Sequence, residues 1–211
     1  MDISFQTALI LAPHTDDGEF GCGGTIAKLV SEGVRVVYVA FSAAEQSVRK
    51  GLPNDILRRE VILATRDLGI LSDDCIVLNF EVRRFPEHRQ AILQSMVDLN
   101  LRYKPDVVFL PSLNDTHQDH QVIAVEGFRA FKKVTMLGYE VPWNNLNFTT
   151  TGFFELSESD LSKKCLALGR YASQSHRDYA STEFVRSLAV IRGTQVGKRY
   201  AETFQVIRLV I

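Results

Sequence analysis

Short apolar runs that alternate with helical segments constrain the fold of this chain more than any other feature. Five strand-like runs are rich in apolar and β-branched residues, and we predict strands at 7–12, 34–41, 75–78, 105–111 and 135–140. Apolar residues at helical spacing predict helices from about residue 19 to 33, and at 55–68, 87–101 and 119–131. Strands and helices in this alternation form βαβ units with right-handed crossovers, so the sheet should be mainly parallel.

The sequence changes character after Pro142. Residues 143–154 are rich in Asn and Thr, residues 157–171 predict a helix with Ser157 as its N-cap, and residues 204–211 predict a final strand. No linker or repeat is evident. We therefore predict one α/β domain over residues 1–211: a Rossmann-like three-layer sandwich with a mainly parallel sheet of five or more strands and an elaborated C-terminal segment.

Composition excludes several classes of protein. The 24 basic and 25 acidic side chains give a net charge of −1, which offers no overall field for nucleic acid or an anionic membrane. No apolar run approaches the roughly 20 residues of a membrane helix, and the N-terminus lacks a basic signal region. The 3 cysteines are far apart and form no CxxC pair, which argues against disulfides and a thiolate zinc site. We expect a cytoplasmic protein without an integral membrane segment, and leave a homo-oligomer open.

Two polar clusters follow predicted strands. The first, at 14–17, reads His-Thr-Asp-Asp after the first strand, and the second, at 117–120, reads His-Gln-Asp-His after the fourth. Ligands of open α/β sheets bind outside the carboxyl ends of the strands, and crossing connections make sequence-distant strands neighbours. We therefore expect the two loops to meet at one edge of the sheet.

The imidazoles and carboxylates of these clusters suit a zinc ion with an open position for water. Zinc lowers the pKa of bound water from about 15.7 to about 7, and a further carboxylate can act as general base. The adjacent Asp16 and Asp17 can divide these tasks, since consecutive loop side chains point in different directions. Taken singly, the first cluster could be a helix N-cap with solvated acids and the second a pair on one helix face. Their joint placement after buried strands favours a site.

Nucleotide binding is a second reading of the same region. The glycine-rich run at 21–24 begins a helix after a strand, where backbone N–H groups attract phosphate. However, the run is not GxGxxG, and no acid suited to a ribose follows the second strand. We expect these glycines to allow close packing of the helix on the sheet. Cys22, within the run, is expected to be a small buried hydrophobic residue.

The two clusters resemble the motifs of the PIG-L/LmbE-like family of zinc-dependent sugar N-deacetylases. The segment 14–17, followed by the glycine-rich run, resembles the family's His-Pro-Asp-Asp motif, and 117–120 matches its His-x-Asp-His motif. Weaker similarities lie at Arg58 and Glu60 and at 171–174 and 201–204, so the resemblance spans nearly the whole chain. Two departures are Thr15 in place of proline and Gly18 in place of an acid, whose role is lost or passes to Glu19.

The resemblance implies roles for the motif residues. The three zinc ligands that it implies are His14, Asp17 and His120. Another divalent transition metal could take the place of zinc. Asp16 would be the general base, and His117 would stabilise the oxyanion and protonate the departing amine. Asp119 would orient and charge His117. These roles agree with the chemistry of amide hydrolysis, which needs hydroxide, a Lewis acid on the carbonyl and a proton for nitrogen.

The implied substrate is an N-acetylated amino sugar of the N-acetylglucosamine type, free or on a carrier. Arg58 is a candidate for contacts with its polar groups, with a surface ion pair to Glu60 as the alternative. Trp143 could stack on a sugar or fill the interface with the C-terminal segment, and His176 could line the cleft. The alternative function is a non-catalytic metal- or carbohydrate-binding protein of the same fold, which metal analysis and an acetate-release assay would distinguish.

Overall fold

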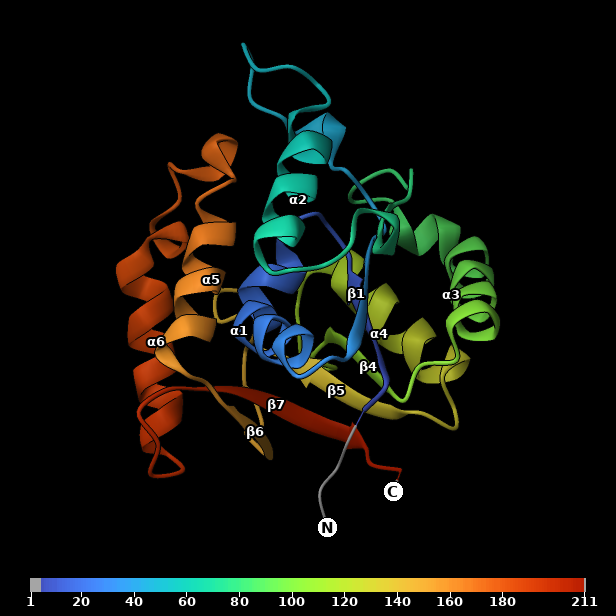
Figure 1. Ribbon diagram of the computed structural model, residues 1–211. Helices are drawn as coiled ribbons and strands as arrows, with labels where there is room; N and C mark the ends of the chain where they lie inside the picture. The colour runs from blue at the N-terminus through green and yellow to red at the C-terminus, as the bar shows by residue number, and fades with distance from the viewer. Residues whose placement is uncertain (1–4, 211) are drawn as a thin grey trace.

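A seven-stranded sheet forms the centre of the computed structural model, which describes residues 5–210 (Figure 1). Its strands lie in the order β3-β2-β1-β4-β5-β7-β6. Their bounds are β1 Thr7–Ala12, β2 Arg35–Ala40, β3 Cys75–Val77, β4 Val107–Pro111, β5 Thr135–Tyr139, β6 Gly152–Glu155 and β7 Ala201–Arg208. β1 to β5 are parallel, as predicted, whereas β7 is antiparallel to both of its neighbours.

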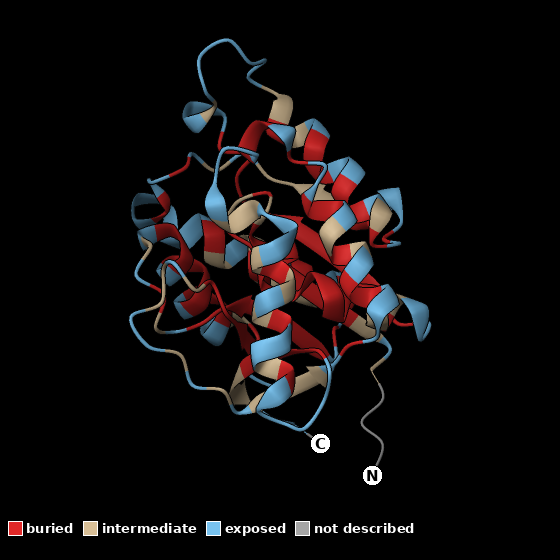
Figure 2. Cartoon of the chain, turned by 90° about the vertical axis from the view of Figure 1, so that its left-hand side faces the viewer, coloured by how far each residue is buried: buried red, intermediate tan, exposed pale blue. Residues whose placement is uncertain are grey.

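Helices cover both faces of this sheet, which confirms the predicted α/β fold. Their bounds are α1 Asp17–Ser31, α2 Ile56–Asp67, α3 Arg89–Tyr103, α4 Gln118–Ala130, α5 Glu158–Leu168 and α6 Thr182–Thr194. Buried side chains of α1, α2 and α5 pack on one face, and those of α3 and α4 pack on the other. The central strands β1, β2, β4 and β5 are buried between the layers, whereas β3, β6 and the end of β7 are only partly buried, and the helices expose their outer faces (Figure 2). α6 packs outside α5 over a third, smaller core.

Helix ends follow the signals in the sequence. Gly33 and Gly69 stand just past α1 and α2 with φ of +85° and +93°, a conformation that favours glycine. Ser157 begins α5 with a capping box, because its side chain accepts a hydrogen bond from the Asp160 N–H and Asp160 caps the Ser157 N–H in return. The predicted N-cap at Ser157 is therefore confirmed, and α1 and α2 end close to the predicted bounds at 33 and 68.

The C-terminal third differs from the prediction. β6 lies at the end of the Asn- and Thr-rich stretch, where a four-residue edge strand depends on its partner β7 more than on its own sequence. α6 was not predicted, because its exposed Val190 and Ile191 obscure the two-faced pattern of a surface helix. β7 begins at Ala201 rather than at 204 and ends at Arg208. Ile211, the last residue of the predicted strand, lies outside the described residues.

α1 is broken at Cys22, whose φ and ψ of −147° and 24° are not helical. The Glu202 carboxylate accepts hydrogen bonds from the backbone N–H groups of residues 24–25 (3.0 and 2.6 Å), where the second half of the helix begins. Lys164 Nζ donates to the Phe20 carbonyl and to Glu202, both at 2.6 Å. A buried ion pair thus satisfies backbone groups that the break leaves free.

Of the predicted run at 21–24, Gly21 lets α1 lie directly on the sheet, whereas Gly23 and Gly24 face Lys164 and Leu156; Gly18, outside the run, also lies against the sheet. A Cβ atom added to Gly21 would lie 2.3 Å from the Tyr139 ring of β5, and one added to Gly18 would lie 2.5 Å from the Tyr38 ring of β2. Close contact here places the first turn of α1 over the carboxyl ends of the strands.

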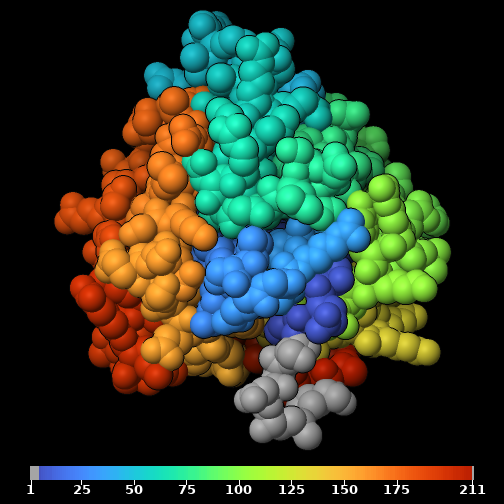
Figure 3. Space-filling view, viewed as in Figure 1, coloured from blue at the N-terminus to red at the C-terminus, as the bar shows by residue number. Residues whose placement is uncertain are grey.

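The segment between β2 and α2, which includes the short helix Glu45–Ser47, projects at the top of the view in Figures 1 and 3.

None of the helices within residues 5–210 combines the length and the apolar character needed to cross a membrane.

Candidate functional site

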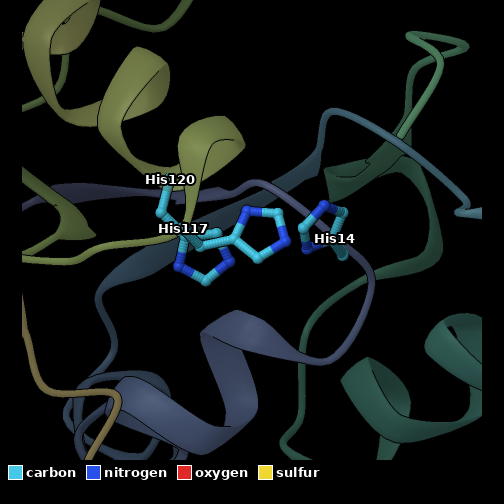
Figure 4. A group of neighbouring side chains, drawn as sticks. All are labelled: His14, His117 and His120. Carbon is cyan, nitrogen blue, oxygen red and sulfur yellow. The ribbon is translucent and has the colours of Figure 1, made fainter. Parts of the chain in front are cut away.

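The two histidine clusters meet where the direction of the chain through the sheet reverses. β1 lies between β2 and β4 and pairs with both, so the loops after β1 and β4 leave the same edge of the sheet side by side. Figure 4 shows the imidazole of His14, from the loop after β1, beside those of His117 and His120 at the start of α4. Ligand nitrogens of the three histidines lie within 4.8 Å of one another. The predicted meeting of the loops is confirmed.

Asp17 brings a carboxylate oxygen between two of these rings. Its Oδ2 lies 3.1 Å from His14 Nδ1 and 3.2 Å from His120 Nε2. Tetrahedral zinc with bonds of about 2.0–2.1 Å requires ligand atoms about 3.3 Å apart. The geometry of His14, Asp17 and His120 therefore fits a zinc-type ion.

Carboxylates hold the other nitrogen of each of these two histidines. His14 Nε2 lies 2.9 Å from Asp119 Oδ2, and His120 Nδ1 lies 2.8 Å from Asp115 Oδ2. Both acids are buried. A carboxylate that accepts the far N–H of a histidine directs the near nitrogen toward a metal, so the donor set has the outer partners typical of such sites.

Attraction between the carboxylates and imidazoles of this cluster favours the ionised forms of Asp17 and His14. Burial acts against ionisation of Asp17, but His120 and His14 hold the pKa of Asp17 well below its usual range. Burial lowers the pKa of His14, whereas Asp17 and then Asp119 raise it, to about 8 overall. A carboxylate that remains ionised while buried is suited to bind a cation.

Asp16 lies in the same cavity as this cluster but does not join it. Among the described residues no other side chain hydrogen-bonds its carboxylate. Burial and the neighbouring Asp17 raise the pKa of Asp16 to about 6, while His14 and Arg177 act in the opposite direction. The carboxylate is therefore free to accept a proton from a ligand in the cavity.

His117 is the N-cap of α4. Its Nδ1 accepts a hydrogen bond from the Asp119 backbone N–H at 3.1 Å, so a neutral His117 carries its proton on Nε2. Burial lowers the pKa of His117, and the nearby His120 and His14 add to this effect. The Asp119 carboxylate contacts His14 and not the His117 ring, which differs from the role that the family resemblance implied.

Two tyrosine hydroxyls support the loop after β1, in which Thr15 stands where the family motif has proline. The Thr15 carbonyl accepts hydrogen bonds from the hydroxyls of Tyr38 (2.8 Å) and Tyr171 (2.7 Å). Glu19 is fully buried beneath this loop and contacts both hydroxyls, and burial raises the pKa of Glu19 to about 8. Glu19 therefore supports the loop and does not line the cavity.

The site opens into a cavity of about 320 Å³. Trp143 lines it and stacks on Tyr179, with ring centroids 3.7 Å apart and planes at 12°, so Trp143 is both exposed to the cavity and packed against the C-terminal segment. His176 is not among the lining residues. Arg58 lies outside this cavity, where its guanidinium donates to the Val77 carbonyl and to Asn79 Oδ1.

Several residues of the site were not assigned from sequence. Asp115 stands two residues before His117 in the same loop, and its acidic side chain there was the available signal. Arg83, Arg177 and Tyr179 also line the cavity, but they come from loops and a short 3-10 helix without a recognisable motif. Glu60, the alternative partner of Arg58, instead accepts hydrogen bonds from Ser173.

Residues 9–131 match the PIG-L family, described as GlcNAc-PI de-N-acetylase. The chain is 27% identical over 172 residues to the uncharacterized deacetylase YaiS of Escherichia coli K12, covering 78% of this chain and 90% of that protein. It is 23% identical over 218 residues to the diacetylchitobiose deacetylase of Thermococcus kodakarensis, covering 93% of this chain and 81% of that protein.

The fold also occurs in an enzyme that is a hydratase and not a deacetylase. The structure of GalB from Pseudomonas putida KT2440, a 4-carboxy-2-hydroxymuconate hydratase, superposes with a TM-score of 0.80 at 21% identity over 98% of each chain. The fold therefore does not decide the reaction, which depends on the residues of the site.

The family match covers residues 9–131 of 211 and includes both histidine motifs, and the chain belongs to the PIG-L family.

Proposed function

We propose that the protein is a metal-dependent hydrolase that removes the acetyl group from an N-acetylated amino sugar or sugar conjugate. The observation that carries this proposal is the convergence of His14 Nδ1, Asp17 Oδ2 and His120 Nε2 beside the free carboxylate of Asp16. Family membership and the deacetylase relatives support amide hydrolysis rather than another reaction of the fold.

His14, Asp17 and His120 would hold the ion. Two imidazoles and one carboxylate suit zinc, and another divalent transition metal could occupy the same set. When bound, such an ion lowers the pKa of water and polarises the amide carbonyl. Asp119 and Asp115 keep the two imidazoles oriented for it.

Asp16 and His117 divide the proton chemistry. Asp16 accepts the proton of the attacking water, since its carboxylate lies in the cavity and is not bound by another side chain, and it can pass this proton to the amine nitrogen as the C–N bond breaks. His117 lines the cavity and its Nδ1 accepts from the Asp119 N–H, so its Nε2–H remains to donate to the amide oxygen as negative charge develops there. Trp143, on the cavity wall, provides a flat apolar face for the sugar ring.

Metal analysis and acetate release test the proposal together. Purified protein should bind about one zinc or similar ion, and it should release acetate from at least one N-acetylated amino sugar. Asp16→Asn should keep the metal and lose about 10²–10⁴-fold in kcat. Asp17→Ala and His120→Ala should lose both metal and activity. His88→Ala, a change of an exposed histidine outside the cavity, is the matched control and should lose neither.

Three outcomes would contradict parts of this proposal. Failure to bind a divalent ion, even after reloading, would exclude the hydrolase. Binding of metal without release of acetate from any N-acetylated sugar would favour the alternative, a non-catalytic metal- or carbohydrate-binding protein. Full turnover by Asp16→Asn would remove the assigned base.

We also infer that the chain acts as one domain in the cytoplasm. β7 and β6 complete the sheet that the family segment begins, which supports a single unit over 1–211. The three free cysteines are consistent with a reducing compartment. Measurement of the unfolding transition by two independent probes tests the single unit, and fractionation of the source cell tests the location.

A further inference from the structure

A fully buried acid lies beneath the candidate active site and has no part in the chemistry proposed above. Glu19, in the first turn of α1, is 0% exposed and does not line the cavity. Its Oε1 lies 2.7 Å from the Tyr171 hydroxyl, and its Oε2 contacts the Tyr38 hydroxyl. Tyr38 belongs to β2, Tyr171 follows α5, and both are buried. Three distant parts of the chain therefore converge in one buried polar cluster.

This cluster binds a single backbone carbonyl. The Thr15 carbonyl oxygen accepts from the hydroxyls of Tyr38 and Tyr171, and each of these hydroxyls also contacts Glu19. A carbonyl oxygen has two lone pairs, so the two hydroxyls use its full accepting capacity. The peptide group between Thr15 and Asp16 is therefore held by side chains that come from outside the loop.

The peptide group held in this way directly precedes Asp16, the proposed general base. On the other side of Asp16 the helix fixes the chain, because the Asp16 carbonyl accepts from the Phe20 N–H at 3.0 Å. The Asp16 carboxylate itself is bound by no other side chain among the described residues. The direction of this carboxylate therefore depends on the two peptide groups that flank it, and the tyrosine hydroxyls hold one of them.

The proposed metal ligands have supports of their own. The His14 N–H donates to Asp17 Oδ2 at 2.8 Å, and buried carboxylates hold the far nitrogens of both histidine ligands. None of these contacts involves a tyrosine hydroxyl. Loss of the hydroxyls of Tyr38 and Tyr171 should therefore disturb the base more than the donor set.

Both departures of this chain from the family motif belong to the same cluster. Thr15 stands where the motif has proline, so the φ angle at this position lacks the restraint of a proline ring. Gly18 stands where the motif has an acid, and a Cβ atom there would lie 2.5 Å from the Tyr38 ring. The Gly18 N–H also donates to the Tyr38 hydroxyl at 3.1 Å. Glycine thus makes room for the tyrosine that holds the Thr15 carbonyl, and an acid stands one position later as Glu19.

We propose that Glu19, Tyr38 and Tyr171 form a clamp on the Thr15–Asp16 peptide that orients the Asp16 carboxylate, in place of the restraint that proline at position 15 would supply. The three side chains are positioning residues, since none of them lines the cavity. The proposal rests on the deacetylase function proposed above and identifies what places its base.

Removal of the two hydroxyls tests the clamp by acetate release. The double variant Tyr38→Phe/Tyr171→Phe keeps both rings and should lose about 10–100-fold in kcat, because a displacement of about 1 Å in a catalytic group costs about 100-fold. KM and zinc affinity, the latter measured by competition with a chelator, should not change. Tyr139→Phe is the matched control, since its buried hydroxyl donates to the Leu11 carbonyl of β1 at 3.0 Å, outside the loop. A fall in kcat no larger than that of Tyr139→Phe, or one that follows loss of zinc, would overturn the clamp.

Further variants distinguish orientation of Asp16 from a general loss of structure. In the Asp16→Asn background the two Phe substitutions should not lower the residual kcat further, because they act through the base, and an undiminished fall would overturn this role. Glu19→Leu should act like the double variant, whereas Glu19→Gln, whose amide can contact both hydroxyls, should keep kcat. Equal turnover by Glu19→Leu and Glu19→Gln would remove Glu19 from the clamp.

Proline at position 15 should rescue the double variant. The Thr15 N–H donates no hydrogen bond within residues 5–210, and φ at Thr15 is not positive, so proline fits this position. Thr15→Pro, added to Tyr38→Phe/Tyr171→Phe, should recover most of the lost kcat and should change little in the wild-type protein. No recovery would overturn the view that the clamp replaces the proline restraint.

Amide hydrogen exchange of the metal-free protein separates the clamp from the function on which it rests. The backbone amides of residues 14–17 should exchange about tenfold faster in the double variant than in Tyr139→Phe or the wild-type protein, the scale of one lost hydrogen bond. Equal exchange in the three proteins would overturn the clamp. No acetate release from any sugar by the wild-type protein would overturn the proposed function, and exchange at residues 14–17 would then decide on the clamp alone.

Discussion

Replacement of Lys164 by methionine tests the contact that joins the two halves of α1. The side chains of Lys164 and Glu202 are 6% and 7% exposed, and their 2.6 Å ion pair lies beside the break at Cys22. Methionine has a similar volume but leaves the Glu202 charge without a cation and the Phe20 carbonyl without its donor. Removal of one partner from a buried ion pair costs about 3–5 kcal/mol.

The expected loss lies near the lower end of this range. Glu202 keeps its two backbone N–H donors at residues 24–25 in the Lys164→Met variant, so we expect a loss of about 3 kcal/mol. A domain of this size loses about 2–4 °C in Tm per kcal/mol, which predicts a decrease of about 6–12 °C. Urea unfolding followed by circular dichroism measures the free energy, and a thermal scan measures Tm.

An exposed pair of the same type is the control. Lys198 and Glu155 lie 2.8 Å apart with side chains 48% and 55% exposed, so Lys198→Met should cost less than about 1 kcal/mol. The second substitution Glu202→Gln, added to Lys164→Met, should recover about 1 kcal/mol, because it removes the uncompensated charge. A loss in Lys164→Met no larger than that in Lys198→Met would refute the reasoning.

Two further predictions concern contacts beneath the site. Asp115→Asn removes the charge that holds the Nδ1–H of His120 and should weaken zinc binding about 10–100-fold, measured by competition with a chelator; unchanged affinity would contradict this role. Gly21→Ala places a Cβ 2.3 Å from the Tyr139 ring and should destabilise the protein by about 1–3 kcal/mol in urea unfolding, and a neutral result would show that α1 can move away from the sheet.

The parallel part of the sheet could be predicted because four of its five strands are almost fully buried. Such strands consist of nearly continuous apolar residues, as in Thr7–Ala12 and Val107–Pro111, whose residues are almost all buried. Gly33 and Gly69 follow α1 and α2 at positions where the backbone adopts a left-handed conformation, which favours glycine. Local sequence and tertiary environment agree at these elements, so the sequence pattern was sufficient.

The C-terminal elements could not be predicted in the same way. β6 exists because β7 offers it a partner, and its four residues are only partly buried. The exposed apolar side chains Val190 and Ile191 made the helix period of α6 unclear. Both elements depend on contacts between distant parts of the chain, and a local window of sequence does not contain these contacts.

The meeting of the two histidine clusters could be predicted because each cluster lies on one loop and the two loops follow neighbouring strands. The pairing of each histidine with a particular carboxylate could not be predicted from the sequence. This pairing depends on how the imidazole rings are oriented at the edge of the sheet. The Asp119 carboxylate contacts His14, whereas the family resemblance implied that it acts on His117.

An Asp119→Asn variant distinguishes these two assignments. A carboxylate that holds the Nε2–H of His14 stabilises the metal-binding nitrogen of that ring, so its loss should weaken zinc binding about 10–100-fold in a chelator competition. A carboxylate that acts on His117 would leave zinc affinity intact and would lower kcat on the metal-loaded enzyme. Asn retains an oxygen that can accept from the Arg83 N–H, so loss of the loop alone does not explain weaker binding. Weakened zinc binding therefore supports the contact with His14, and unchanged affinity with a lower kcat supports the role on His117 that the family resemblance implies.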